Sequence, residues 1–332
     1  MKSVQIVLFD GFDLLDAIAP YEVFCAAELF ADKPWEVSFV TAEGARPVAS
    51  GINGTTLTAS GDLDPARAGI IIIPGASGEL EGDGPDTVPS ILMRTMQTEL
   101  TAKLRTAMQQ PDVVVATVCG GSLILAMGGL LEGRPAVTNR LGMELLESTG
   151  AIPVPARVVD DENLVTGGGV TSGLDVALHL VERELGPRIA HAVERLFEFE
   201  RRGTIWRNTG AAIRTNHADD AKVPHTSDLT PHAAFDGDWD TTIATPIGKL
   251  QVRLLISTKD GIMNGTATQG EESVPFLNPE IRDGKLNWSL NITKPLRLKL
   301  KFEVTVSGDQ LTGTAKAGVL PASKLTGIRI LR

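Results

Sequence analysis

Short apolar runs recur through the first 200 residues, and most are followed by a stretch with helical spacing. Several runs are rich in valine and isoleucine, which is typical of strands buried on both faces of a sheet. The runs lie at residues 4–9, 35–41, 69–73, 113–118, 157–160 and 164–166. Apolar residues spaced three or four apart then predict helices, the longest at residues 85–110 and 174–200. Alternating strands and helices predict a doubly wound parallel sheet over residues 1–205.

The pattern changes near residue 235, where short runs begin to alternate between apolar and polar positions. Turn dipeptides such as Asp283-Gly284 separate these runs, as in antiparallel hairpins. We therefore expect residues 232–332 to form a smaller antiparallel all-β domain, either a barrel or a sandwich. The segment Gly237-Asp238-Trp239 is similar to the G-x-W opening of lipocalin-like barrels.

Residues 206–231 separate the two patterns. They are polar and rich in Thr, Asn, Asp and Ala, so we expect a linker. His217 and His225 lie in it and His232 follows it, but their spacing fits no common metal-site template. We therefore expect no metal site.

Length and composition agree with two globular domains. A chain of 332 residues with 42% apolar content can bury two cores. Its only cysteines, Cys25 and Cys119, argue against a disulfide framework and favour a reducing, cytoplasmic location. No apolar window is long enough to span a membrane, so we expect no membrane partner. The net charge is −10, and residues 1–224 hold 18 basic against 30 acidic side chains, which disfavours a nucleic-acid partner.

The most informative stretch is residues 113–131, which reads VVVATVCGGSLILAMGGLL. A buried strand runs into Cys119, two glycines follow, and a helix starts at once. Such a turn exposes its side chain in a crevice at the carboxyl edge of the sheet. The free N–H groups of the helix start lie beside the sulfur, where they would lower the thiol pKa and bind an anion. The alternative is a cysteine that only fills the core.

Other candidate residues follow the ends of other strands. Asp16 precedes the helical segment at residues 17–30, so it is either a helix cap or an acid that faces Cys119; Glu22 is an alternative acid. Gly75 and Ala76 follow a central strand, and their amides form a candidate anion nest. The loop at residues 167–173 lacks the lysine of a P-loop, and its Thr171 is a candidate substrate-binding residue.

Four segments of the first domain, in this order and spacing, resemble the DJ-1/PfpI superfamily. They read VLFDGFDLLDAIAPYEVF, IIIPGAS, ATVCGGSLILAMGGLLEGRPAVTNR and NLVTGGGVTSGLD. The strongest likeness is to the isonitrile hydratase branch and to the amidotransferase-like domains of some AraC-type regulators. The resemblance implies a flavodoxin-like sheet of the class I glutamine amidotransferase type, in a homodimer. It also implies a nucleophile elbow at Cys119 and an acid at Asp16.

Three positions depart from the family's pattern. The hydratase branch has a threonine after the cysteine, where this chain has Gly120, and Ser122 is the hydroxyl we expect to replace it in part. Asn139 stands where the superfamily commonly has a histidine, which removes a base. The usual double glycine is Gly75-Ala76 here.

The resemblance implies a cysteine-dependent hydratase that adds water to an isonitrile, giving an N-substituted formamide, with no cofactor or metal. In this hypothesis Cys119 attacks a small electrophilic substrate, Asp16 carries the proton, and the Gly75 and Gly120 amides bind the developing anion. The first alternative is a non-catalytic sensor or small-ligand-binding protein. The second is glyoxalase- or deglycase-like action on 2-oxoaldehydes, which the replacement of histidine by Asn139 disfavours.

Overall fold

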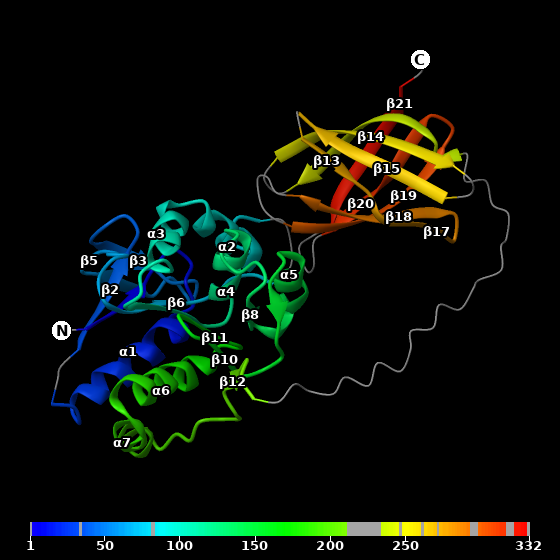
Figure 1. Cartoon of the computed structure of the whole chain (residues 1–332). Coiled ribbons are helices and arrows are strands. Elements are labelled where there is room, and N and C mark those ends of the chain that lie inside the picture. Colours follow the sequence, from blue (N-terminus) through cyan, green and yellow to red (C-terminus); the bar gives the residue numbers. More distant parts are fainter. Residues whose placement is uncertain are drawn as a thin grey trace. The chain divides into compact units, whose positions relative to one another are not determined.

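The computed structural model of the chain describes residues 2–32, 35–80, 84–210, 234–245, 248–259, 262–270, 272–292, 298–316 and 322–330. The chain divides into two compact units (Figure 1). The first consists mainly of the chain up to Arg207, and the second of most of the chain beyond it. Within the described residues, no helix is both long and apolar enough to cross a membrane.

The first unit is built on a mostly parallel sheet of eight described strands, in the order β12-β10-β11-β7-β6-β1-β2-β5. All its pairings are parallel except β10 with β11, which form an antiparallel hairpin at one side. The strands are β1 (Ser3–Val7), β2 (Glu36–Thr41), β5 (Gly61–Asp62), β6 (Gly69–Ile73), β7 (Val113–Thr117), β10 (Val158–Asp161), β11 (Leu164–Gly167) and β12 (Trp206–Arg207). Two small ribbons pair β3 (Arg46–Ala49) with β4 (Thr56–Ala59) and β8 (Pro135–Ala136) with β9 (Ile152–Pro153). This confirms the predicted doubly wound sheet, apart from its antiparallel hairpin.

Helices cover both faces of this sheet (Figure 1). On one face α1, α6 and α7 pack together, and on the other α2, α3 and α4 do so. The helices are α1 (Leu14–Glu28), α2 (Val88–Met96), α3 (Glu99–Ala107), α4 (Gly121–Met127), α5 (Met143–Ser148), α6 (Ser172–Leu185) and α7 (Pro187–Phe197), with a 3-10 turn η1 (Arg140–Gly142) before α5. The central strands β1 and β6 are buried at every position, which explains the unbroken apolar run of β6. In β1 the buried Gln5 side chain instead hydrogen-bonds the backbone of Asp64.

Two predicted long helices are each broken in two. In residues 85–110 the break falls at Thr98, whose extended backbone and side-chain oxygen cap α3 at the Leu100 N–H. In residues 174–200 it falls at Gly186, which adopts φ 91° and is followed by Pro187 at the start of α7. Apolar residues keep their helical spacing across both breaks, so periodicity alone does not reveal them.

Two other predictions about residue positions also need correction. The segment expected to be a linker begins inside the first unit, because Trp206 and Arg207 form β12 and pair with β10. Asp16 neither precedes its helix nor caps it. Helix α1 begins at Leu14, and its cap is Asp13, which accepts hydrogen bonds from the Leu15 and Asp16 N–H groups. The three linker-region histidines lie outside the described residues.

The second unit is an antiparallel sheet of nine described strands, in the order β16-β15-β14-β13-β21-β20-β19-β18-β17. These are β13 (Gly237–Thr245), β14 (Gly248–Lys259), β15 (Ile262–Gln269), β16 (Glu272–Pro275), β17 (Leu277–Arg282), β18 (Lys285–Ile292), β19 (Leu298–Ser307), β20 (Gln310–Lys316) and β21 (Ser323–Arg329). The two end strands, β16 and β17, follow each other in the chain through Phe276, and β17 also contacts β15. The sheet therefore nearly closes into a barrel, which is one of the two antiparallel forms, barrel or sandwich, that the alternating pattern predicted.

Aromatic side chains fill the inside of this barrel. Trp288 lies between Phe276 and Phe302, with ring centroids 4.5 and 4.8 Å apart and nearly parallel planes. Trp239, of the G-x-W segment, is fully buried; its indole N–H donates to the Phe235 carbonyl and Arg329 covers its ring. These contacts give the small domain a dense apolar core.

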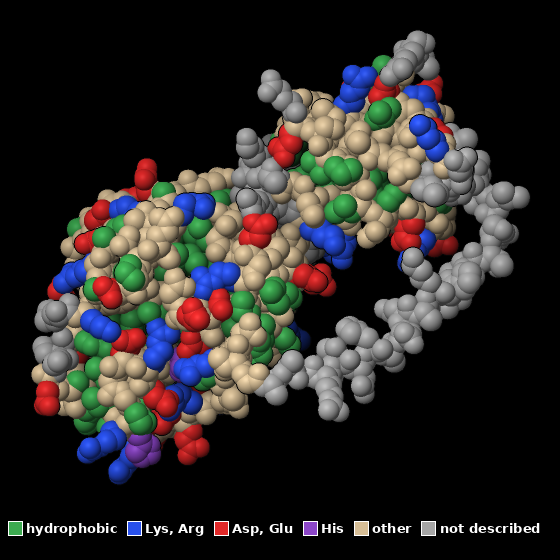
Figure 2. All heavy atoms as spheres, viewed as in Figure 1, with side chains coloured by type: hydrophobic (Ala, Val, Ile, Leu, Met, Phe, Trp, Pro, Cys, Tyr) green, Lys and Arg blue, Asp and Glu red, His purple; other side chains and the backbone are tan. Residues whose placement is uncertain are grey.

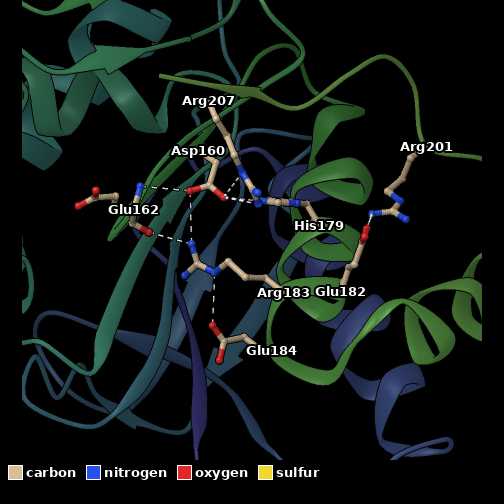
Figure 3. Close-up of polar contacts among 8 residues, drawn as sticks. All are labelled: Asp160, Glu162, His179, Glu182, Arg183, Glu184, Arg201 and Arg207. Carbon is tan, nitrogen blue, oxygen red and sulfur yellow. Dashed lines mark hydrogen bonds and ion pairs between the residues drawn. The ribbon is translucent and has the colours of Figure 1, made fainter. Parts of the chain in front are cut away.

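Charged side chains of both signs are intermixed on the face of each unit seen in Figure 2. Asp160 is one of several buried acidic residues in the first unit. Asp160 of β10 accepts a 2.7 Å hydrogen bond from His179, and it forms ion pairs with Arg183 and with Arg207 of β12 (Figure 3). Burial by itself would raise the pKa of Asp160, but the hydrogen bond and charge of His179, with the two arginines, lower it below 3.8. This cluster ties the last strand of the first unit to its sheet.

We predict that Asp160→Ala lowers the free energy of unfolding by about 2–3 kcal/mol, because buried donors lose their acceptor. Urea unfolding followed by far-ultraviolet circular dichroism measures this. Asp10→Ala, which removes an exposed carboxylate paired with Arg46, should cost less than about 1 kcal/mol. Because the folded-state pKa of Asp160 is lowered, its contribution is complete above pH 3.8 and disappears as the pH falls through the folded-state pKa. Equal losses for the two variants would contradict the role of the cluster.

Candidate active site

Cys119 occupies a strained turn between β7 and α4. Its backbone lies in the left-handed region at φ 54°, which costs a non-glycine residue about 1–3 kcal/mol. The turn is held by the Cys119 N–H, which donates to the Gly167 carbonyl, and by the Thr138 hydroxyl, which donates to the Cys119 carbonyl. The strand, the turn and the helix start occur where the sequence predicts them.

Two glycines allow the backbones around this turn to approach closely. A Cβ atom on Gly121 would lie 2.2 Å from the Ile73 carbonyl oxygen, so only glycine fits there. A Cβ on Gly75 would lie 2.8 Å from Asp16 Oδ2 and 3.1 Å from Cys119 Cβ. The end of β6, the start of α1 and the elbow therefore meet at one point.

Asp16 reaches this point from the first turn of α1. Its side chain is fully buried, and Oδ2 accepts a 2.8 Å hydrogen bond from the Gly75 N–H. Oδ1 is buried with no hydrogen-bond partner of standard geometry among the described residues. Burial and then the charge of Asp13 raise the pKa of Asp16 well above 3.8, although hydrogen bonds with Gly75 and Cys119 act in the opposite direction. Asp16 is thus a carboxyl with raised proton affinity beside the thiol.

The thiol pKa contradicts the sequence-based expectation. Burial, followed by the charge of Asp16, raises the pKa of Cys119 from 9 to about 12, and hydrogen bonds from Asn139 and the Gly120 amide offset this only in part. The side chain is 7% exposed, and the seven-residue helix α4 is short. Loss of hydration therefore outweighs the helix end, and the resting sulfur is a thiol.

Asn139 has a fixed orientation. Its Oδ1 accepts a hydrogen bond from the Leu141 N–H, so its Nδ2 group must face the Cys119 sulfur, 3.4 Å away. An amide in this orientation can stabilise negative charge on sulfur but cannot accept a proton. Asn139 therefore replaces a base with a neutral donor.

Several predicted site residues do not join this group. The Gly75 amide is engaged by Asp16 and is not free to bind an anion. The Ser122 hydroxyl is fully buried, donates to the Val137 carbonyl and contacts the Thr117 hydroxyl, so it cannot orient water. The Thr171 hydroxyl accepts from Arg157.

Ala76 and Glu22 also lie outside the group. Ala76 pairs with Phe12 in an isolated bridge. Glu22 is exposed, and its charge acts on Cys25 rather than on Cys119.

A cavity of about 380 Å³ opens above the sulfur. Eight of its lining residues are aliphatic, proline or methionine, and none is charged. The lining consists of Leu80, Val88, Pro89, Leu92, Cys119, Gly120, Leu123, Met127, Asn139, Leu141, Gly142 and Leu145. Polar groups are supplied by the elbow and by Asn139. Among the described residues no cluster of His, Cys, Asp or Glu side chains is suited to hold a metal ion.

Two residues contribute to this site that the apolar pattern did not single out. Leu92 of α2 lies against Gly120, where a Cβ would be 3.1 Å from Leu92 Cδ1, so the missing side chain at position 120 leaves room in the cavity. Asp13 is the second, and an Asp three residues before a second Asp at a helix start is a recognisable capping signal.

The model of the DJ-1/PfpI family matches residues 2–183, more than half of the chain. The isonitrile hydratase of Pseudomonas putida is 38% identical over 130 residues, which cover 39% of this chain and 51% of the hydratase. The HTH-type transcriptional regulator GbdR of Pseudomonas aeruginosa is 26% identical over 204 residues, covering 60% of this chain and 51% of the regulator. The match thus spans about half the length of each of these relatives.

The fold gives the same relationship. The crystal structure of a THiJ/PfpI family protein from Pseudomonas syringae superimposes with a TM-score of 0.51 at 25% identity, over 63% of this chain and 79% of the other. The matched part of the chain contains the elbow cysteine, the acid on α1 and the strands that position them. The chain therefore belongs to the DJ-1/PfpI family.

Proposed function

We propose that the first unit is a cysteine-dependent hydratase that converts an isonitrile and water into an N-substituted formamide. The observation that carries the proposal is the buried Asp16–Cys119 pair, whose cysteine lines an apolar cavity. The likeness to an isonitrile hydratase supports the same reaction. We expect the active form to be a homodimer.

In this reaction the pair works with a single shared proton. The Cys119 sulfur bonds to the isonitrile carbon as its proton passes to Asp16, which then delivers it to that carbon and leaves a thioimidate. Water adds to the same carbon, the nitrogen is protonated, and the carbon–sulfur bond breaks. The products are the formamide and the free thiol. Asn139 and the Gly120 amide, which both hydrogen-bond the sulfur, stabilise negative charge on it during the attack.

The cavity indicates the substrate. A charged substituent would find no counter-charge among its lining residues, whereas a compact apolar group would contact leucine and valine side chains. We therefore propose an uncharged isonitrile with an aliphatic or aromatic substituent. The same apolar lining disfavours small, polar 2-oxoaldehydes.

A second candidate is a ligand-binding protein without catalysis. The raised pKa of Cys119, to about 12, and the amide in place of a base favour it. The likeness to a transcriptional regulator supports it too. In this role an apolar ligand would occupy the cavity and leave unchanged.

Cys119→Ala should lower the turnover of an apolar isonitrile at least about 1,000-fold, because no nucleophile remains. Asp16→Asn should lower it by about 100- to 10,000-fold, because the amide cannot carry the proton. Formamide detected by proton NMR measures both, and Cys25→Ala is the control expected to keep full activity. Ligand binding by wild-type protein without any formamide would favour the second candidate.

The thiol pKa gives a prediction independent of any substrate. In Cys25→Ala protein, the rate of Cys119 alkylation by iodoacetamide at pH 8 should be roughly 1,000-fold below that of an ordinary thiol, since the pKa is about 12 rather than 9. The rate should rise with pH up to at least pH 10. A plateau below pH 8 would mean a preformed thiolate and would contradict the proposed proton sharing.

Leu141→Asp should raise the KM for an apolar isonitrile about tenfold, equivalent to about 1.4 kcal/mol, with little change in kcat. Leu141 lines the cavity and is 52% exposed, so the variant should fold. Leu196 is also 52% exposed but lies on α7, outside this lining, which makes Leu196→Asp the matched control. An equal change in KM for both variants would mean that the cavity does not bind the substrate.

A further inference from the structure

Asp13 takes part in a closed ring of hydrogen bonds around the Asp16 carboxyl. The Asp13 N–H donates to the Gly75 carbonyl at 2.8 Å, and the Gly75 N–H donates to Asp16 Oδ2 at 2.8 Å. The Asp16 N–H completes the ring by donating to Asp13 Oδ1 at 3.3 Å. The ring fixes the start of α1 to the loop after β6. It therefore holds the Asp16 carboxyl against the elbow.

The Asp13 side chain is 8% exposed, and no Lys, Arg or His forms an ion pair with it among the described residues. Its partners are the N–H groups of Leu15 and Asp16 at the helix start. A neutral Asn or Ser side chain would cap the helix about as well. The cap thus accounts for the hydrogen bonds at position 13 but not for a buried negative charge beside the site.

That charge acts on the reacting pair. The titratable groups that influence Asp16 are Asp13, at the start of the same helix, and Cys119, on the elbow. Those that influence Cys119 are Asp16 and, more weakly, Asp13. Two carboxyl groups held this close disfavour a second negative charge, so a proton is retained on Asp16.

We infer that Asp13 is a positioning residue that holds the Asp16 carboxyl in place and, through its charge, keeps a proton on the Asp16–Cys119 pair. The inference rests on the proposed use of that pair as nucleophile and proton carrier. Only the singly protonated pair can form a thiolate next to an acid. Asp13 therefore sets the pH above which the pair becomes competent, since the doubly protonated pair must first lose one proton.

Carboxyl ¹³C NMR of aspartate-labelled protein tests the charge directly. Asp13→Asn keeps a capping side chain and removes the charge, and Asp16→Asn identifies the Asp16 signal. In Asp13→Asn the Asp16 titration should move to lower pH by about one unit. Asp10→Asn, which removes a carboxylate that is 60% exposed and paired with Arg46, should leave it unchanged. An Asp16 titration that does not move in Asp13→Asn would overturn the inference.

Two further measurements separate charge from structure. Asp13→Asn should keep the wild-type Tm, whereas Asp13→Ala should lower it, because alanine cannot cap the helix. Asp13→Ser gives the same charge test with a second capping side chain. If Asp13 served only as a helix cap, Asp13→Ala would lower the Tm, and the Asp16 titration would stay at its wild-type pH in Asp13→Asn and Asp13→Ser. That result would also overturn the inference.

The pH dependence of isonitrile turnover distinguishes this inference from the proposed function. The acid limb of kcat/KM should move to lower pH in Asp13→Asn by the same amount as the NMR titration. If wild-type protein turns over no isonitrile, the proposed reaction fails and the NMR shift still decides the role of Asp13. If turnover occurs and its acid limb stays where it is in wild type, the role of Asp13 is wrong while the reaction stands.

Discussion

The left-handed backbone of Cys119 is tolerated because three chain segments approach each other without side chains between them. Gly121 lies against the Ile73 carbonyl, and Gly75 lies against the Asp16 carboxyl and Cys119 Cβ. This approach places a thiol, a carboxyl and an amide donor in one buried space. The central parallel strands make it possible, because their carboxyl ends meet at one edge of the sheet. The geometry of the site is a consequence of that close contact.

Burial then decides the chemistry of the pair. A helix end stabilises a nearby charge by about 0.3–1 kcal/mol. Raising a thiol pKa from 9 to about 12 corresponds to about 4 kcal/mol, so desolvation is the larger effect. Burial raises the proton affinity of both groups. In the proposed reaction the pair carries one proton, and a nucleophile forms only as this proton moves from the thiol to the Asp16 carboxylate. An apolar cavity suits such a pair, because it keeps water from hydrating the charges.

The sequence predicted the elements of the fold well where one local pattern determines them. The unbroken apolar strands, the glycine turn after Cys119 and the alternating strands of the barrel were all recognisable. The helix breaks at Thr98 and Gly186 were not recognisable, because apolar residues keep their helical spacing across them. The pairing of β12 with β10 could not be predicted either, because Arg207 contacts Asp160, which is far from it in the sequence.

The site was only partly predictable for a similar reason. The proximity of Asp16 and Cys119 follows from strand order, but the pKa of each depends on burial and on Asp13, which a linear pattern does not show. The partners of Ser122 and of the Gly75 amide likewise depend on packing. The Ser122 hydroxyl and the Gly75 amide were therefore predicted to contact the substrate, although each already has a hydrogen-bond partner within the protein.

The central claim is that the Cys119 sulfur bonds to the substrate carbon at the floor of the apolar cavity. Acid-quenched samples of protein and an apolar isonitrile, examined by intact mass and peptide mapping within the first turnover, test it most directly. We predict a mass gain equal to one isonitrile on the peptide that contains Cys119. No gain in protein that still forms formamide, or a gain on the Cys25 peptide instead, would contradict the account.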